Sequence, residues 1–448
     1  MKKVNLLEGP IDSSLRAFAF PLALSFVINM VYAWVDMYYV SRLGDEAIAA
    51  LGATEQLLFL IFAIGFGFAV GSGIIIARRI GEGNQDSASH TVAQALVIGL
   101  TLAITLSLMV YFGSTYVFQF LKLEEAVVAK ANSYIQSISI GIIFNFTIFQ
   151  INSIIRSTGN SFYPLLILIT SNVLNAAISP IFIFGLGPIE PMGIFGAGLG
   201  TSTAQFLGML FGLYLLNFKF GELKPKWKGF SIDFTLLGRI ILLGIPASMQ
   251  LLVVALNRFF LIRITMLFSQ DLMTSYIIGL RVDLLVFMSI FALGAAIEVI
   301  TSQNLGAKKI DRVFKYYYSA IKQISGLMIF LTVVVWLFGH NIAEIFTDNE
   351  VILEQVKVYL RIISFSYVTF AIGIVSIRVV SGAGAYFKSL MMVVLVIFII
   401  QLPLAYILSQ YTGLQEEGIW YGILISQVLF AVIGHATVLR KRWITVKV

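Results

Sequence analysis

Asp36 is the residue whose type and position in this sequence point most directly to chemistry. It lies deep within a long apolar segment, 15–41. If this segment crosses a membrane, a carboxylate inside it costs about 2.5–3.5 kcal/mol on insertion scales, so such residues usually carry function. Because burial disfavours the charged form of a carboxyl group, Asp36 could bind a proton from one side of the membrane and release it to the other. The alternative is a structural carboxylate that caps or pairs locally.

Three further polar residues share a helix face with Asp36. Ser25, Asn29, Tyr32 and Asp36 are spaced at i, i+4, i+7 and i+11, which places them on one side of a helix. We expect this face to point into the protein rather than at lipid. We predict that Asn29 and Tyr32, together with Asn172, contact the substrate.

The composition indicates that these residues act within a membrane protein. The chain has 448 residues, of which 59% are hydrophobic and only 12% are charged, and its mean hydropathy is +0.93. A soluble fold would need more polar residues to cover its surface. The composition therefore excludes a soluble globular protein and a disordered chain. Because the chain has no cysteine, a disulfide scaffold and a thiolate metal site are excluded too.

Twelve membrane-spanning helices are predicted from apolar runs of about 20 residues, which are too long for alternating barrel strands. The fold class is therefore all-α integral membrane. The spans are expected at 15–41, 53–77, 90–113, 128–155, 162–186, 193–217, 236–267, 274–302, 314–338, 352–380, 386–409 and 417–439.

Lysine and arginine are distributed unevenly between the two sides of this predicted bundle. Most of them fall in the loops on the side of the N-terminus, so the positive-inside rule places both termini in the cytoplasm. We expect a multi-pass protein of the plasma (cytoplasmic) membrane that contacts membrane lipids. The net charge of +7 then reflects topology, and no nucleic-acid partner is expected.

The two halves of the sequence repeat one another at an offset of 225 residues. Pro21 matches Pro246, and Gly159 matches Gly384. Because each half holds six spans, both insert with the same orientation, and a pseudo-two-fold axis along the membrane normal relates the two six-helix lobes. The substrate path is expected in the cleft between them. The N-terminal lobe, the cytoplasmic linker and the C-terminal lobe are expected at 1–217, 218–235 and 236–448.

Several motifs, taken together and in order, resemble the multidrug and toxic compound extrusion (MATE) family in its prokaryotic type. They are the first helix and following loop at 20–52, the glycine motifs GFGFAVGSGIIIARRIGEGN at 65–84 and TSQNLGAKK at 301–309, and the turn RSTGNSFYP at 156–164. The resemblance implies a two-lobed exporter that opens alternately to either side of the membrane. It also implies that organic, drug-like amphiphiles leave in exchange for entering protons or Na⁺. Flippases for lipid-linked saccharides share the fold and remain an alternative.

The resemblance also implies an ion-coupling site on the first, fifth and sixth helices. Asn175 and Thr201 match an asparagine and a threonine of one branch of the family, and Asp36 matches its first-helix aspartate. Ser179 stands where that branch has a second aspartate. Since hard cations prefer several oxygen ligands, carboxylates especially, the serine favours proton coupling at Asp36. Na⁺ at Asp36, Asn175 and Thr201 remains the alternative, and no other metal is expected.

The C-terminal half carries charges of its own within predicted spans. Arg258 and Arg281 are expected at similar depth on neighbouring helices. We predict that Asp283 pairs with Arg258, which leaves Arg281 to contact anionic or zwitterionic substrates or to serve the structure of the hairpin. Glu298 is expected near the cytoplasmic surface, in an ion pair with a loop lysine.

An enzyme and an ion channel are the rival classes. The three histidines, His90, His340 and His435, are far apart in the sequence, and no phosphate-binding G-x-x-x-x-G-K-[ST] loop occurs, so neither catalysis nor ATP-driven transport is indicated. A single deep carboxylate in a duplicated bundle fits a carrier better than a channel. We expect no cofactor, a monomer, and small organic compounds as substrates whose identity the sequence does not specify.

Overall fold

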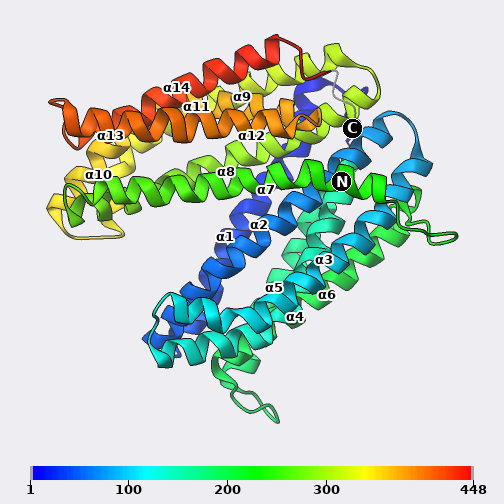
Figure 1. The fold of residues 1–448 in the computed structure, drawn as a ribbon, viewed down its shortest axis with the longest axis horizontal. Helices are drawn as coiled ribbons and strands as arrows, with labels where there is room; N and C mark the ends of the chain where they lie inside the picture. Colours follow the sequence, from blue (N-terminus) through cyan, green and yellow to red (C-terminus); the bar gives the residue numbers. More distant parts are fainter. Residues whose placement is uncertain (1–3, 445–448) are drawn as a thin grey trace. The chain divides into compact units, whose positions relative to one another are not determined.

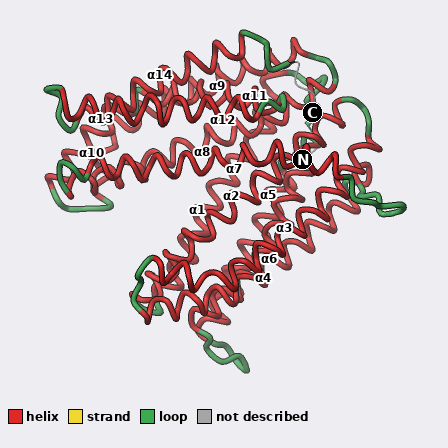
Figure 2. Tube along the Cα trace, in the orientation of Figure 1, coloured by secondary structure: helices red, strands yellow, loops and turns green. Residues whose placement is uncertain are grey.

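The computed structural model describes residues 4–444, except the side chain of Glu222, and within this range the chain is helical without any strand. Eleven helices are long and apolar enough to cross a membrane. A bent pair of shorter helices, α10 (Glu350–Ile363) and α11 (Ser366–Gly382), passes the same test as a twelfth span. The predicted all-α membrane fold with twelve spans is therefore confirmed. Short loops join most of the helices (Figure 2).

The chain divides into two compact units. The first contains Leu24–Ser248, and the second contains Asn5–Ala23 and Met249–Val448. The first part of the first helix therefore packs with the second unit, and the first part of the seventh helix packs with the first unit. The division into lobes at 1–217, 218–235 and 236–448 stays a prediction.

The helices of the first unit pack around α4, which contacts α2, α3 and α6, while α5 packs on α6 (Figure 1). In chain order, the helical elements that lie wholly or partly in the first unit are α1 (Ile11–Ser41), α2 (Asp45–Gly81), α3 (Gln85–Phe120), α4 (Glu125–Ser157), α5 (Phe162–Phe184), α6 (Gly193–Phe218), the 3₁₀ turn η1 (Gly221–Leu223) and α7 (Phe234–Thr265). Small residues allow these helices to approach closely, as in other membrane bundles. A Cβ atom at Gly71 of α2 would lie only 2.6 Å from the carbonyl oxygen of Ile240, which explains why the first part of α7 belongs to this unit.

The linker after α6 is held on α3. The side-chain amide of Gln94 donates to the carbonyl oxygen of Ser231 at 2.5 Å and accepts from the backbone N–H of Asp233 at 3.2 Å. Lys226 forms an ion pair with Asp86 at 2.6 Å. The basic segment between the two halves is thus held on α3 by contacts at Lys226, Ser231 and Asp233.

In the second unit, α11 contacts α8, α9 and α14, and α13 packs on α14. The helices are α8 (Gln270–Gly306), α9 (Ile310–Glu344), α10 (Glu350–Ile363), α11 (Ser366–Gly382), α12 (Tyr386–Val394), α13 (Leu402–Tyr411) and α14 (Glu417–Leu439), with a π-helical segment, Leu395–Gln401, between α12 and α13. The π-helical segment interrupts the span predicted at 386–409 as a single α-helix.

The span predicted at 352–380 is not one straight helix, because α10 and α11 are bent by 53°. The break lies at Ser364, whose carbonyl oxygen and hydroxyl group accept hydrogen bonds from side chains of the neighbouring helix α9. Thr332 donates to the Ser364 carbonyl oxygen at 3.0 Å, and the indole N–H of Trp336 donates to its hydroxyl at 3.0 Å. A side chain that inserts into the backbone ladder of a helix is a recognised cause of a kink.

Candidate functional site

Asp36 is buried in the structure, with 7% of its side chain exposed. Its Oδ1 atom is inaccessible and has no hydrogen-bond partner among residues 4–444. An unsatisfied buried polar atom costs about 1–3 kcal/mol, and more when it belongs to a charged group. The Oδ1 atom of this carboxyl group therefore receives neither a local cap nor a hydrogen bond within the described part of the chain.

Asn175 on α5 and Thr201 on α6 lie in direct contact. The Asn175 amide donates to the Thr201 hydroxyl at 2.9 Å, and only 1% and 5% of these two side chains are exposed. The Oδ1 atom of Asn175 has no partner in the described part of the chain. After the Oδ1 atom of Asp36, this is a second buried oxygen without a hydrogen-bond partner.

Ser179 lies one turn further along α5 and faces the same helix pair. It is fully buried, and a Cβ atom at Gly200 would lie 2.6 Å from its hydroxyl oxygen, so glycine at 200 makes this close approach possible. The Ser179 hydroxyl has no hydrogen-bond partner among the described residues. Asn175, Ser179 and Thr201, which the family resemblance implied as one site, are therefore brought together.

Two tyrosines connect α1 to this helix pair. The Tyr39 hydroxyl, one turn after Asp36, donates to the carbonyl oxygen of Ala176 at 3.2 Å. Tyr32, one turn before Asp36, lies close to the Thr201 hydroxyl and interacts electrostatically with Asp36. The fold thus places Asp36 and Tyr32 next to α5 and α6.

The sequence analysis missed Tyr134 of α4 as a member of this group. Its side chain is 5% exposed, and it interacts electrostatically with Asp36 and Tyr32 and also with Glu55 of α2. Tyrosine is common in the spans of this chain, so no sequence signal distinguishes Tyr134. The packing of α4 on α2, together with the electrostatic interaction with Asp36 of α1, associates Tyr134 with this group.

The residues predicted to bind substrate are placed differently from one another. Asn29 is exposed on α1, whereas Asn172 is half-buried on α5 with its amide nitrogen unpartnered among the described residues. The side-chain oxygens of Asn145 on α4 and Gln205 on α6 also have no hydrogen-bond partner among the described residues. The three central helices of the first unit therefore carry several amide groups that could bind a polar part of a substrate.

The predicted ion pair between Arg258 and Asp283 is wrong. Asp283, 2% exposed, accepts hydrogen bonds from Tyr359 at 2.5 Å and from Tyr367 at 2.6 Å, whereas Arg258 is exposed and lies beyond ion-pair distance. The two tyrosines stand on either side of the break between α10 and α11, which the sequence did not reveal. Neutral hydroxyl groups satisfy the buried carboxylate at a lower cost in desolvation than an arginine would incur.

The partners found for Glu298 are ones that the sequence analysis did not name, and the predicted pairing with a loop lysine stays a prediction. Glu298 is 6% exposed and pairs with Arg378 of α11 at 3.3 Å, and it also accepts a hydrogen bond from the Tyr386 hydroxyl. Gly382 allows α11 to pack against the backbone of Glu298, which brings Arg378 within reach of the carboxylate.

Arg281 is exposed on α8, with its guanidinium carbon 5.4 Å from the centre of the Phe346 ring. Within residues 4–444 it has no acidic partner at ion-pair distance, so its charge is available to a ligand. The same range contains no group of three or more histidine or acidic side chains placed to hold a metal ion.

The chain as a whole is similar to several known proteins. A family model described as MatE matches residues 21–181 and 246–407, two segments that begin at the matched prolines Pro21 and Pro246. The probable multidrug resistance protein YoeA of Bacillus subtilis is 27% identical over 419 residues, which cover 91% of this chain and 89% of that protein. An FAD transporter of Shewanella oneidensis is 23% identical over 433 residues, covering 96% and 94%. A solved structure of a MOP superfamily transporter from Pyrococcus furiosus superposes with a TM-score of 0.91 at 25% identity, covering 100% of this chain and 99% of that one.

Proposed function

Since this chain belongs to the MATE family of multidrug efflux transporters, we propose that it exports organic amphiphiles in exchange for protons, with Asp36 as the residue that binds the coupling proton. Access to the transport path alternates between the two sides of the membrane as the two lobes rearrange. The protein acts as a monomer in the plasma membrane, with both termini in the cytoplasm. It is a transporter and not an enzyme.

The observation that supports proton coupling is the unsatisfied oxygen of Asp36. A buried carboxylate without a partner is costly in its charged form and much less costly when it carries a proton. The free energy of burying Asp36 therefore depends on whether its carboxyl group carries a proton. The packing of α1 against α5 and α6 depends on the same protonation. Binding a proton from outside and releasing it inside would couple the two conformations of the carrier.

Na⁺ is the alternative coupling ion, and a specific observation keeps it open. The Oδ1 atom of Asn175 and the hydroxyl of Ser179 are also unpartnered in the described part of the chain. Together with Asp36 they offer oxygen ligands, which hard cations require. Only one of these groups is a carboxylate, so the charge of Na⁺ would be compensated less well than at a site with two. This difference favours the proton.

Two separate observations, one in each unit, bear on the chemistry of the substrate. Amide groups on α4, α5 and α6 can hydrogen-bond a polar substrate, and the unpaired charge of Arg281 favours an anionic or zwitterionic one. The relative in Shewanella oneidensis is named as a transporter of FAD, an organic anion. We therefore include anionic amphiphiles among the substrates to be tested.

The decisive experiment is transport by purified protein in liposomes with imposed gradients. One proton charge crossing about 100 mV supplies about 2.3 kcal/mol, enough to sustain roughly a fifty-fold gradient of a neutral substrate. We expect this gradient in the wild type under a pH difference and a membrane potential, and we expect Asp36→Asn to abolish it. Asp45→Asn, which removes an exposed carboxylate at the start of α2, is the matched control and should transport normally.

Two results would contradict the proposal. Wild-type rates in Asp36→Asn, at equal amounts of folded protein, would show that Asp36 does not couple transport. Accumulation that follows an imposed Na⁺ gradient at constant pH, and is absent with a pH gradient alone, would assign the coupling to Na⁺ instead.

A further inference from the structure

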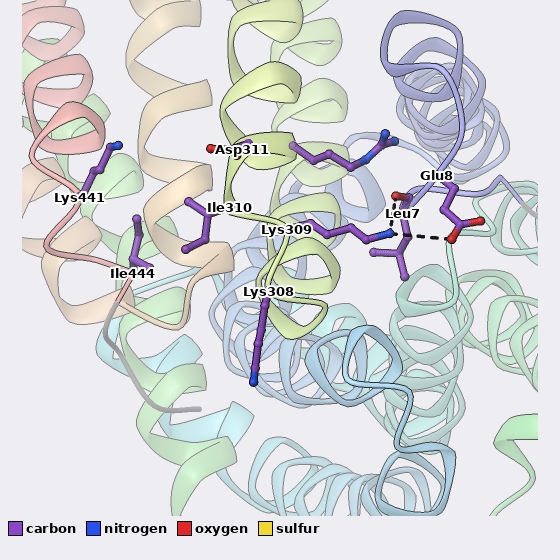
Figure 3. A pocket seen from close by; sticks show the side chains of 9 residues that line it. Leu7, Glu8, Lys308, Lys309, Ile310, Asp311, Lys441 and Ile444 are labelled. Carbon is purple, nitrogen blue, oxygen red and sulfur yellow. Dashed lines mark hydrogen bonds and ion pairs between the residues drawn. The ribbon is translucent and has the colours of Figure 1, made fainter.

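A basic pocket of about 780 Å³ lies in the second unit, on the side predicted to be cytoplasmic (Figure 3). The turn between α8 and α9 forms its centre, with the segment before α1 on one side and the residues after α14 on the other. Its charged lining consists of Lys308, Lys309, Arg312 and Lys441 with the acidic Glu8 and Asp311, so positive charge is in excess. The pocket shares no residue with the proposed transport site.

Two of the four basic side chains are already engaged by the segment before α1. Arg312 donates to the carbonyl oxygen of Gly9 at 2.7 Å. Lys309 donates to the carbonyl oxygen of Leu7 at 3.2 Å and lies 3.9 Å from the Glu8 carboxylate (Figure 3). Lys308 and Lys441 are exposed, and neither has an acidic partner at ion-pair distance among the described residues. Their two charges are available to a ligand.

The internal repeat shows that the lysines of this turn are not required by its backbone. The turn between α2 and α3 is its counterpart at the offset of 225 residues, and it has the same hydrogen bonds. Gly83 donates to Ile80 and Asn84 donates to Arg79, both at 3.0 Å, just as Lys308 donates to Leu305 at 3.0 Å and Lys309 donates to Asn304 at 2.8 Å.

The first half uses the residues that suit such a turn. Gly83 has a φ of 72°, in the left-handed region that glycine adopts at little cost, and the Asn84 side chain caps α3 by accepting from the Ser87 N–H. Lys308 has a φ of 58° and is strained there, while Lys309 supplies no side-chain cap to α9. The second half therefore gives up local stability for two positive charges at one point of its surface.

Lys441 repeats this pattern on the other side of the pocket. It too has a left-handed backbone, with a φ of 57°, and its ammonium group lies 5.0 Å from the centre of the Phe314 ring. Two lysines in an unfavourable conformation thus line the same cavity. Residues held in such conformations cluster at ligand clamps and other functional positions.

We propose that this pocket binds the phosphate group of an anionic ligand, and that the ligand is the head group of an anionic phospholipid of the cytoplasmic leaflet. Ammonium and guanidinium groups are the usual partners of phosphate, and basic pockets at this level of a membrane protein bind anionic head groups. The apolar side chains of Leu7, Ile310 and Ile444 line the same pocket, which suits an amphiphile better than a small inorganic ion. Since Leu7 and Glu8 belong to the segment before α1, a bound lipid would also hold that segment against α9.

The proposal is tested by measuring lipid binding to the purified full-length chain in detergent by native mass spectrometry. The probes are short-chain phosphatidylglycerol, short-chain phosphatidylcholine and glycerol 3-phosphate. The test variant Lys308→Gly/Lys309→Asn introduces the residues of the first half at the same turn. The control Lys315→Gln removes one exposed positive charge of α9 that does not line the pocket.

We expect the wild type to bind phosphatidylglycerol more tightly than phosphatidylcholine. The double variant should lose about tenfold or more in affinity for phosphatidylglycerol, whereas the control should keep it. Because glycine relieves the strained backbone and asparagine restores the cap, these gains should offset the lost contacts of Lys309 with Leu7 and Glu8, and the double variant without lipid should melt near the temperature of the wild type. This readout separates loss of a binding site from loss of structure.

Equal affinity for the two lipids, or unchanged affinity for phosphatidylglycerol in the double variant, would overturn the proposal. If glycerol 3-phosphate competes with phosphatidylglycerol, and the double variant also binds glycerol 3-phosphate more weakly, the phosphate site is supported but its ligand is a soluble phosphate and not a lipid. If it does not compete, the lipid is supported as the source of the phosphate.

Discussion

Asp283 joins the two halves of the broken span, and removal of either tyrosine hydroxyl should loosen that junction. Tyr359 lies near the end of α10 and Tyr367 near the start of α11, and each donates to a different oxygen of the carboxylate. A hydrogen bond to a charged group contributes about 1.5–3 kcal/mol in soluble proteins, and a typical one between membrane helices contributes about 0.6 kcal/mol. We therefore expect Tyr367→Phe and Tyr359→Phe each to lower the free energy of unfolding by about 1–2 kcal/mol.

Thermal unfolding of the purified protein in detergent measures this effect. For a unit of roughly 200 residues, the expected loss corresponds to a decrease of about 2–8 °C in Tm. Tyr276→Phe is the matched control, because Tyr276 is 2% exposed and packs on Tyr359 but forms no hydrogen bond to Asp283 within the described chain. In the double variant Tyr359→Phe/Tyr367→Phe the two losses should not add, since both hydroxyls serve one carboxylate.

The reasoning is refuted if both single variants melt within about 1 °C of the Tyr276→Phe control, which corresponds to less than about 0.5 kcal/mol. Strictly additive losses in the double variant would show two independent contacts and no junction through Asp283.

Three further predictions concern other sites. Ser179→Asp should increase the Na⁺ dependence of transport by supplying a second carboxylate near Asp36; an unchanged response to Na⁺ in liposomes would argue against a cation site on α5. Arg281→Ala should reduce export of an anionic amphiphile about tenfold while a matched cationic amphiphile is exported normally; equal loss of both, with a lower Tm, would make Arg281 structural. Arg378→Met should lower the free energy of unfolding by about 3–5 kcal/mol, because it leaves the buried Glu298 without its guanidinium partner. Adding Glu298→Gln should recover part of that loss, and no recovery would mean that charge pairing is not what stabilises this position.

Much of the candidate site could be predicted because its residues are polar in apolar surroundings. Asp36 is conspicuous within the apolar segment 15–41, and its burial was expected from that contrast. Asn175 and Thr201 could be assigned through the resemblance to a known family. Tyr134 could not, since a tyrosine within a span is ordinary until the fold brings it within electrostatic reach of a buried carboxylate.

The partners of the buried acids in the second unit show where sequence reasoning ended. The distances along the chain suggested Arg258 for Asp283, but the tyrosines that bind it come from more than 70 residues away. They converge on Asp283 because the span bends at Ser364, where Thr332 of α9 donates a hydrogen bond to the Ser364 carbonyl oxygen. The ion pair of Glu298 with Arg378 likewise depends on tertiary packing, because Gly382 permits α11 to approach α8 closely.

The sequence alone therefore determined the membrane environment, the number of spans, the duplication and the single deep carboxylate of the first helix. These properties follow from the hydrophobicity and spacing of residues along the chain, and the bilayer imposes them on any arrangement of helices. Only the tertiary structure decided which groups satisfy each buried charge and which atoms are left without a partner. Side-chain contacts depend on where a helix bends and how closely two helices approach, and those features arise from packing between segments that are distant in the sequence.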